Sequence, residues 1–412
     1  MSDVRLLIRF KYFRRFAFSS LTNDNFRRYA LSQAISMVGN WMQIVSQSGL
    51  VLSLTGSGAM VGLVIAVQTL PTLLAAPYGG LIADRWPKDR LLIITQAVEF
   101  TALILLGSLT ITGVIQIWMV IVLAALVGMS NVVYGPTQAA FVQEIVGREH
   151  VSNAVSLNAA LSNSARVVGP GIAGLLIATV GVGACFLVNA ASSLVVVIAI
   201  VTLDQSRLLR SPRTTRTRGQ LRAALAYARA KRQIRLPLIA AAIIGGLTFE
   251  FPVTLPVFAT DVLGAGASGY GLLVTAMGVG AVFGAIQLTI RPAGGVSAMT
   301  RAAAAFGVLV ILLAAVQTLW VAVLISALVG SRSVRFIAIA NVDLQLAAHG
   351  DMRGRIMGLW LTALAGTTAI GGPLVGVIID LAGARVALLV GGVAAVAAAA
   401  GISLSSRGST TS

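Results

Sequence analysis

Long apolar runs separated by short polar breaks make up most of this chain of 412 residues. A helix needs about 20 predominantly apolar residues to cross the hydrocarbon core of a membrane, and the runs reach that length repeatedly. They lack the strict alternation of barrel strands, which favours helices. The pattern predicts twelve spans, at residues 28–54, 59–81, 91–112, 116–140, 154–179, 184–203, 236–260, 268–290, 298–317, 319–345, 355–381 and 386–404.

One break is much longer than the others and divides the spans into two sets of six. Residues 204–235 begin with an Arg-, Thr- and Ser-rich stretch, and then Leu221, Leu225 and Ala228 recur at helical spacing. This spacing predicts an amphipathic helix on the membrane surface. The predicted order is a basic interfacial segment, a six-helix bundle, a basic linker, a second six-helix bundle and a tail, at residues 1–27, 28–203, 204–235, 236–404 and 405–412.

Composition supports an all-α membrane protein. The chain is 57% hydrophobic and only 10% charged, whereas soluble domains carry roughly 25% charged residues. The net charge of +17 comes from Lys and Arg in the loops of one side. Positive loops mark the cytoplasmic side, which predicts a plasma-membrane protein with both termini in the cytoplasm. Topology and contact with anionic lipid of the cytoplasmic leaflet explain the charge, so we expect no nucleic-acid partner.

The sequence offers little for catalysis. It has no nucleophile–base arrangement, no metal-ligand spacing and no phosphate-binding loop. The single Cys185 excludes an intrachain disulfide. We therefore expect no enzyme activity, no metal and no cofactor.

The polar hinge Gly79–Leu92 joins the second and third predicted spans. Its charges cannot lie in hydrocarbon, so the sequence predicts a loop at the membrane surface. The hinge resembles the signature that the major facilitator superfamily of transporters carries between its second and third helices, through Gly80, Ala83, Asp84, Arg85, Lys88 and Arg90. Trp86-Pro87 and Asp89 depart from that signature, so we expect a different turn.

The resemblance implies that the hinge gates the cytoplasmic side. Asp84 would meet the N-terminal end of span eleven, near Arg355, because a helix N-terminus favours an anion. Arg85 and Arg90 would pair with Glu144 at the cytoplasmic end of span four. The alternative is a loop whose charges serve only topology.

Spans five and eleven share a Gly-Pro motif, which suggests a duplicated six-helix unit. Proline removes a backbone hydrogen bond and bends a span, and small neighbours allow close helix contact. The pattern resembles the Gly-Pro motif of the superfamily's antiporters, although Ala165 and Ala173 replace two of its glycines. Ordinary helix packing is the alternative. The motif residues are Gly169, Pro170, Gly174, Gly372, Pro373 and Gly376.

Three ionisable residues lie deep within predicted spans: Arg166, Glu250 and Arg332. Such groups are costly in hydrocarbon, so each should face a cavity or a partner. The resemblance places spans seven and ten at the cavity, so Glu250 and Arg332 could meet. We interpret Glu250 as a candidate proton carrier, with a static Glu250–Arg332 pair as the alternative. Glu99 lies in span three, which the resemblance places at the periphery.

Polar stripes follow three of the spans in the first half. A helix facing only lipid would not keep such a face, so we expect these residues to line a central cavity. They would either bind substrate or only hydrate the path. The candidates are Ser36, Asn40, Gln43 and Gln47 in span one, Asn131, Tyr134 and Gln138 in span four, and Asn158 and Ser162 in span five.

Within the superfamily the chain is most similar to a bacterial exporter group that includes the enterobactin exporter and macrolide-efflux proteins. The segments that carry this similarity are 39–43, 136–139 and 153–170. The resemblance implies proton-driven export of a small amphipathic compound by a monomer. The alternatives are an uncoupled facilitator or importer, and a non-transporting membrane sensor or scaffold.

Overall fold

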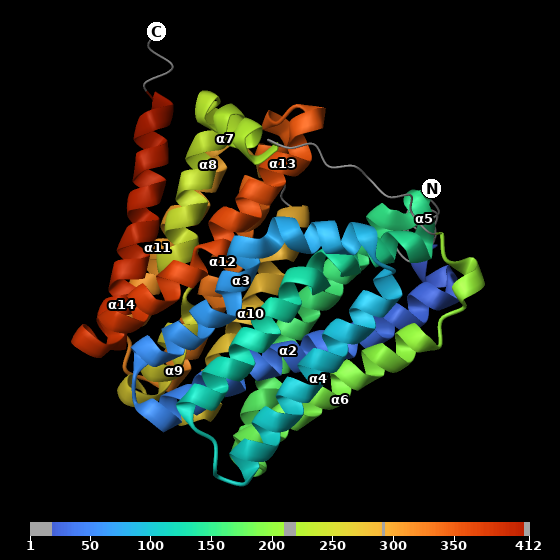
Figure 1. The fold of residues 1–412 in the computed structure, drawn as a ribbon. Coiled ribbons are helices and arrows are strands. Elements are labelled where there is room, and N and C mark those ends of the chain that lie inside the picture. Colours follow the sequence, from blue (N-terminus) through green and yellow to red (C-terminus); the bar gives the residue numbers. More distant parts are fainter. Residues whose placement is uncertain (1–18, 210–219, 291–292, 408–412) are drawn as a thin grey trace, which may run out of the picture.

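The computed structural model describes residues 19–209, 220–290 and 293–407, which form a bundle of long helices (Figure 1). The ends of the predicted tail and terminal segment, and part of the linker, lie outside these residues. The first half begins with a 3₁₀ turn. Its elements are η1 (Ser19–Thr22), α2 (Asp24–Thr55), α3 (Gly58–Arg85), α4 (Lys88–Ile111), α5 (Ile117–Thr179) and α6 (Val182–Val201).

The second half follows a 3₁₀ turn and contains three π-helical turns, η3, η4 and η5. In chain order its elements are η2 (Gln205–Arg207), α7 (Gln220–Ala230), α8 (Arg232–Ile243), η3 (Ile244–Thr248), α9 (Phe251–Val257), η4 (Phe258–Val262), α10 (Gly266–Ile290), α11 (Val296–Ala315), α12 (Leu319–Ala347), α13 (Gly350–Leu361), η5 (Thr362–Gly366) and α14 (Thr368–Arg407).

These helices are compatible with the twelve predicted spans. Helix α5 contains two spans that meet at Gly147 (φ 74°), and α14 contains the end of span eleven and all of span twelve, which meet at Gly383 (φ 86°). Glycine adopts such positive φ angles without steric cost. Span seven runs from α8 through η4, and span eleven runs from α13 into α14. The amphipathic helix expected in the linker is α7.

The hinge is much shorter than the expected loop at Gly79–Leu92. Helix α3 continues to Arg85 and α4 starts at Lys88, so only Trp86 and Pro87 lie outside helices. Proline pushes the residue before it into an extended conformation, and Trp86 has φ −108° and ψ 154°. The break therefore needs two residues, and the prediction of a longer loop was wrong. The break expected between residues 140 and 154 is likewise only a kink.

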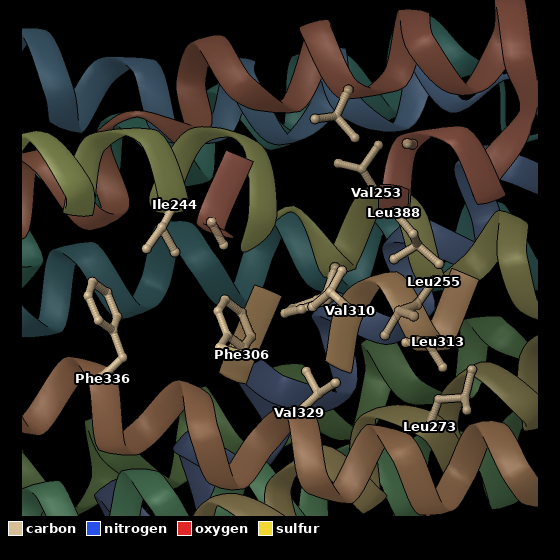
Figure 2. Close-up of a cluster of buried hydrophobic side chains, with 14 of the residues drawn as sticks. Ile244, Val253, Leu255, Leu273, Phe306, Val310, Leu313, Val329, Phe336 and Leu388 are labelled. Atoms are coloured by element: carbon tan, nitrogen blue, oxygen red, sulfur yellow. The ribbon is translucent and has the colours of Figure 1, made fainter. Parts of the chain in front are cut away.

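The apolar core consists of one large cluster that includes side chains of both halves and a smaller cluster within the first half. In the second half, Phe306 stacks on Phe249 with ring centroids 5.1 Å apart, and Figure 2 shows Phe306 among the branched aliphatic side chains around it. In the first half, Tyr29 meets Phe141 edge to face at 5.5 Å. The large cluster thus continues from one half into the other, whereas the smaller one packs helices of the first half alone.

The two halves meet closely at one end of the bundle. We call the end where α3 meets α4 the linker end, and the other end, where α2 meets α3, the opposite end. Near the opposite end α3 packs directly on α14, because a Cβ atom added to Gly62 or Gly376 would collide with backbone of the other helix. The two halves also contact each other between α5 and α10, where a Cβ atom on Gly271 of α10 would lie 2.9 Å from the Pro170 carbonyl of α5. Glycines of the Gly-Pro motifs thus form the contact between halves.

Candidate functional site

Glu250 lies where span seven stops being α-helical. The π-helical turn η3 ends at Thr248, and Glu250 has ψ 36° before α9 begins. Pro252 in the first turn of α9 cannot donate a backbone hydrogen bond, which fixes the break in the sequence. The Glu250 side chain is 1% exposed, and its Oε1 atom has no hydrogen-bond partner among the described residues. A carboxyl group is thus buried at a discontinuity of a span.

Span eleven is also interrupted, directly beside span seven. The π-helical turn η5 of span eleven packs on η3, because a Cβ atom on Gly245 would collide with the Leu364 carbonyl. A Cβ atom on Gly372 would lie 3.6 Å from Glu250 Oε2, and the Thr368 hydroxyl is a polar neighbour of the carboxyl group. The candidate proton carrier therefore faces the Gly372-Pro373 motif. Discontinuous spans of this kind form the ion and substrate sites of many transporters.

The alternative interpretation, a static pair between Glu250 and Arg332, finds no ion pair among the described residues. Arg332 is half-buried on α12, and no ion pair joins it to Glu250 in the described part of the chain. Arg166 instead lies over an aromatic ring, with its Cζ atom 5.1 Å from the centre of the Trp41 ring. Such a cation–π contact partly compensates a cation for lost water. The structure thus keeps Glu250 and the two arginines apart.

The polar stripe of α2 is largely satisfied inside the first half. Gln43 Nε2 donates to Gln47 Oε1 at 3.2 Å, and Gln47 Nε2 donates to Gln68 Oε1 of α3 at 3.1 Å. Asn189 Nδ2 of α6 donates to Gln43 Oε1 at 2.8 Å and to Asn40 Oδ1 at 3.3 Å. Gln43 and Gln47, like Ser36, are buried. In this conformation the hydrogen bonds of Asn40, Gln43 and Gln47 join three helices.

A second polar cluster contains residues that the sequence did not single out. Tyr134 Oη and Gln138 Nε2 of α5 both donate to Gln33 Oε1 of α2, at 3.0 and 2.8 Å. In α4, Gln96 Nε2 donates to Glu99 Oε2 at 2.8 Å. Glu99 lies close enough to Tyr134 to interact electrostatically with it. Glu99 therefore faces a polar cluster, and its spacing of three residues from Gln96 was the available signal.

The remaining cavity candidates all lie on α5. Asn131 is exposed, whereas Asn158 and Ser162 are half-buried on the same long helix. These three side chains are thus more accessible than the buried Gln43 and Gln47 of α2.

At the hinge, Glu144 pairs with Lys88. The Lys88 Nζ and Glu144 Oε1 atoms are 2.8 Å apart, and the side chains are only 13% and 6% exposed. Arg85 and Arg90, the expected partners, are exposed. Lys88 lies in the first turn of α4, and its side chain reaches Glu144 of α5 from there. The residue at which α4 begins therefore decides which cation pairs with Glu144. The contact holds α4 to α5 within the first half.

Asp84 and Asp380 occupy opposite ends of the two facing spans. Asp84 is half-buried and forms no hydrogen bond or ion pair with another described residue. Asp380, near the end of span eleven, accepts hydrogen bonds from Ser57 Oγ and the Gly58 N–H, both at 2.6 Å, and from the Ala59 N–H at 3.2 Å. Its carboxylate therefore caps the first turn of α3, where an anion is favoured.

The Asp380 cap joins the two halves at the opposite end. Asp380 is not among the residues predicted from the sequence, although an acid at the end of a span on the side with few charges was a usable signal. Gly80, beside the unpaired Asp84, is buried in α3 at the linker end. The interactions predicted for Asp84 at the start of span eleven are absent among the described residues.

Comparison with known proteins identifies the family. The family model described as transmembrane secretion effector, in the major facilitator superfamily, matches residues 16–409. The chain belongs to this family. Its fold is that of solved superfamily transporters: the nucleoside transporter NupG matches with a TM-score of 0.72 and 13% identity over 92% of this chain and 98% of that one. A bacterial homologue of the lysosomal transporter Spinster, in an inward-facing and unoccupied conformation, matches with a TM-score of 0.73 and 13% identity over 93% and 96%.

Several relatives of this family member are transporters with exporter or efflux names. The enterobactin exporter EntS of Salmonella paratyphi A is 25% identical, with 86% of each chain covered. The multidrug efflux pump Tap of Mycolicibacterium fortuitum is 26% identical, with 85% of this chain and 88% of that protein covered. The staphyloferrin A transporter of Staphylococcus aureus is 25% identical over 62% of this chain, and the match spans 65% of that protein's length. The chain is thus a multi-pass membrane transporter, and its family is not one of enzymes.

Proposed function

We propose that this transporter exports a small amphipathic organic compound across the plasma membrane in exchange for protons, as a monomer. The names of its relatives include an enterobactin exporter and a multidrug efflux pump. The observation that carries the proton part is Glu250, buried without a cationic partner among the described residues at the break of span seven. A buried carboxylate without a cation is costly, so its proton must be gained and lost when water reaches the site.

The distribution of charge supports an orientation in the membrane, and the contacts between the halves support a conformational state. The basic residues gather at the linker end, which supports a cytoplasmic linker end and cytoplasmic termini. The halves approach through Gly62, Gly372 and Gly376 near the opposite end, and Asp84 at the linker end has no described partner from the other half. These contacts support a state closed to the outside and open to the cytoplasm.

Alternating access then gives each acid a role. From the outward-open state Glu250 takes up a proton, and in the present state it releases that proton toward the cytoplasm as the compound enters. We propose that Asp380 closes the outer side through the start of α3, and that Asp84 closes the inner side through the start of α13. Arg166, Asn158 and Ser162 on α5 supply the polar contacts along the path.

The test uses inverted membrane vesicles with an established proton gradient. Lipophilic dyes, drugs and siderophore-like compounds are added in turn, and the gradient is followed with a pH-sensitive fluorophore. We expect at least one compound to discharge the gradient with the unmodified protein and not with Glu250→Gln. Glu149→Gln serves as the matched control, because Glu149 is an exposed acid at the linker end.

Two results would contradict the proposal in different ways. Labelled compound that equilibrates with no movement of protons would make the protein an uncoupled facilitator. Discharge that is equal in Glu250→Gln and the unmodified protein would leave antiport intact but remove Glu250 as the carrier, and Glu99→Gln would then be the next variant to compare.

A further inference from the structure

A groove outside the site described above lies where the linker helix packs beside spans seven and eleven. Its cavity measures about 420 Å³, within the range of roughly 300–1,000 Å³ typical of small-ligand sites. Helices α7 and α8 form one wall and span eleven forms another. At the deep end the groove reaches α3 of the first half. Residues that mark its course are Leu225 and Arg229 of α7, Arg235 of α8, Leu359 and Ile370 of span eleven, and Leu73 of α3.

The groove has the depth of one membrane leaflet. Along span eleven its wall runs from Leu359 to Ile370, which at 1.5 Å per residue corresponds to roughly 16 Å. The hydrocarbon core is about 30 Å thick, so the groove extends from the linker end to the middle of the membrane. Its walls are apolar and accessible, since Ile239 is 50% and Ile370 is 69% exposed. These dimensions suit a single acyl chain.

The mouth of the groove is strongly basic. Arg229 and Arg235 lie at the linker end of the lining, and both side chains are exposed. The Arg235 Nη1 atom donates to the Arg229 carbonyl at 3.4 Å, which brings the two residues together. Lys231 and Arg232 lie between them in the chain, and no acidic residue occurs from position 205 to 249. A phosphate group is the complement of such paired arginines.

We infer that the groove binds an anionic phospholipid, with its phosphate between Arg229 and Arg235 and one acyl chain extending to Leu73. Leu73 belongs to the first half, whereas the other walls belong to the linker and the second half, so a bound lipid contacts both halves. The assignment to the cytoplasmic leaflet rests on the proposed orientation of the linker end. The site itself is independent of which compound is exported.

The experiment is photo-crosslinking in phosphatidylcholine nanodiscs. The probe is phosphatidylglycerol with a photoreactive group at the end of one acyl chain, and peptide mass spectrometry locates the adducts. We expect adducts at the deep end, around Ala242 and Ile370, at a yield several-fold above that of a phosphatidylcholine probe with the same chain. Equal yields for the two headgroups, or adducts spread evenly over the outer helices, would overturn the inference.

Two sets of variants test the contact with the headgroup and the contact with the acyl chain separately. Arg229→Gln with Arg235→Gln should lower the phosphatidylglycerol yield to that of phosphatidylcholine, whereas a control pair of exposed arginines, Arg28→Gln with Arg301→Gln, should leave it unchanged.

Ala242→Phe should fill the groove and abolish adducts from both probes, and Ala97→Phe on the exposed face of α4 is its matched control. A transported dye that displaces the probe when unlabelled phosphatidylglycerol does not would assign the groove to substrate entry. That outcome would overturn the lipid assignment without affecting the proposed export.

Discussion

At the residue scale, the hinge contains a buried ion pair between Lys88 and Glu144, whose charged atoms are 2.8 Å apart. Lys88→Ala leaves Glu144, which is 6% exposed, without its lysine. Removing one partner of a buried pair costs about 3–5 kcal/mol. We expect the unfolding temperature of the purified protein to fall markedly, as measured by differential scanning fluorimetry.

Two controls show whether pairing causes this loss. Arg85→Ala removes an exposed cation of the same loop and should change the unfolding temperature little. The double variant Lys88→Met with Glu144→Leu should recover most of the loss, because apolar replacement of both partners is often neutral. Equal loss in the single and double variants would contradict the interpretation.

Asp204 gives a pH-dependent prediction outside the spans. The Ser206 hydroxyl and then the Ser206 backbone N–H donate to its Oδ1 atom, at 2.6 and 3.0 Å, and hold the pKa of Asp204 below its ordinary value. A lowered folded-state pKa stabilises the turn above the unfolded pKa, and this stabilisation is lost as the pH falls through the folded pKa.

Hydrogen exchange at the Ser206 amide, corrected for its intrinsic pH dependence, measures this effect. We expect protection to fall with acidification in the unmodified protein. Asp204→Asn should remove the acid-dependent component, and a protection that stays constant with pH in the unmodified protein would argue against the capping role.

Some features of single residues could be predicted from the sequence, and others could not. The depth of Glu250 within a predicted span made it a candidate proton carrier, and the structure buries it at a break of that span. Its separation from Arg332 could not be predicted, because the π-helical turns of spans seven and eleven decide which faces meet. The sequence predicted Arg85 and Arg90 as partners of Glu144, whereas the ion pair in the structure is with Lys88, because α4 starts there.

At the scale of elements, the crossing of α3 and α14 depends on glycine. A Cβ atom on Gly62 would collide with the Gly372 carbonyl, and such overpacking costs about 1–3 kcal/mol. We expect Gly62→Ala to separate the two helices near the opposite end. The reporter is Ile379→Cys in a Cys185→Ser background, since Ile379 is 5% exposed beside Gly58; its labelling by an impermeant maleimide should increase.

Gly49→Ala is the matched control for this variant. Gly49 lies within α2, and a Cβ atom there would meet no atom within 4 Å. The same substitution should therefore leave labelling of the reporter unchanged and stabilise α2 slightly. Equal labelling in the Gly62→Ala and Gly49→Ala proteins would show that the crossing tolerates a methyl group.

The spans were easier to predict from the sequence than the breaks between them. Apolar run length indicated the spans, because a helix must match the membrane thickness. The breaks depend on the backbone conformation of single residues. Pro87 shortens the hinge to two residues, and Gly147 turns an expected loop into a kink. The burial of the polar stripe on α2 could not be predicted either, because its hydrogen-bond partners Asn189 and Gln68 come from other helices.

At the scale of the whole molecule, the Asp380 cap should bias the balance between the two access states. Asp380→Asn removes the negative charge beside the N-terminus of α3, an interaction of about 0.3–1 kcal/mol, which corresponds to a change of up to roughly fivefold in the ratio of states. We expect Asp380→Asn to populate the state closed at the linker end. Spin labels at Trp86→Cys and Gly354→Cys, both exposed, report this change as a shorter distance by pulsed electron paramagnetic resonance.

Asp343→Asn is the control for whole-molecule closure. Asp343 Oδ1 also accepts from a backbone N–H, that of Gly295 at 2.9 Å, but both residues belong to the second half. This variant should weaken a local contact and leave the distance distribution unchanged. An unchanged distribution in Asp380→Asn as well would remove the cap from the closing mechanism.

The Asp380 cap has a consequence for turnover. Asp380 is exposed and its partners are a hydroxyl and two amides, so water can solvate every group as soon as the contact separates. At about 1 kcal/mol, breaking it slows opening only about fivefold. The buried Lys88–Glu144 pair, by contrast, lies within one half. Under the proposed alternating access it would stay intact as the halves move, and the contact that would have to break in every cycle is one that breaks quickly.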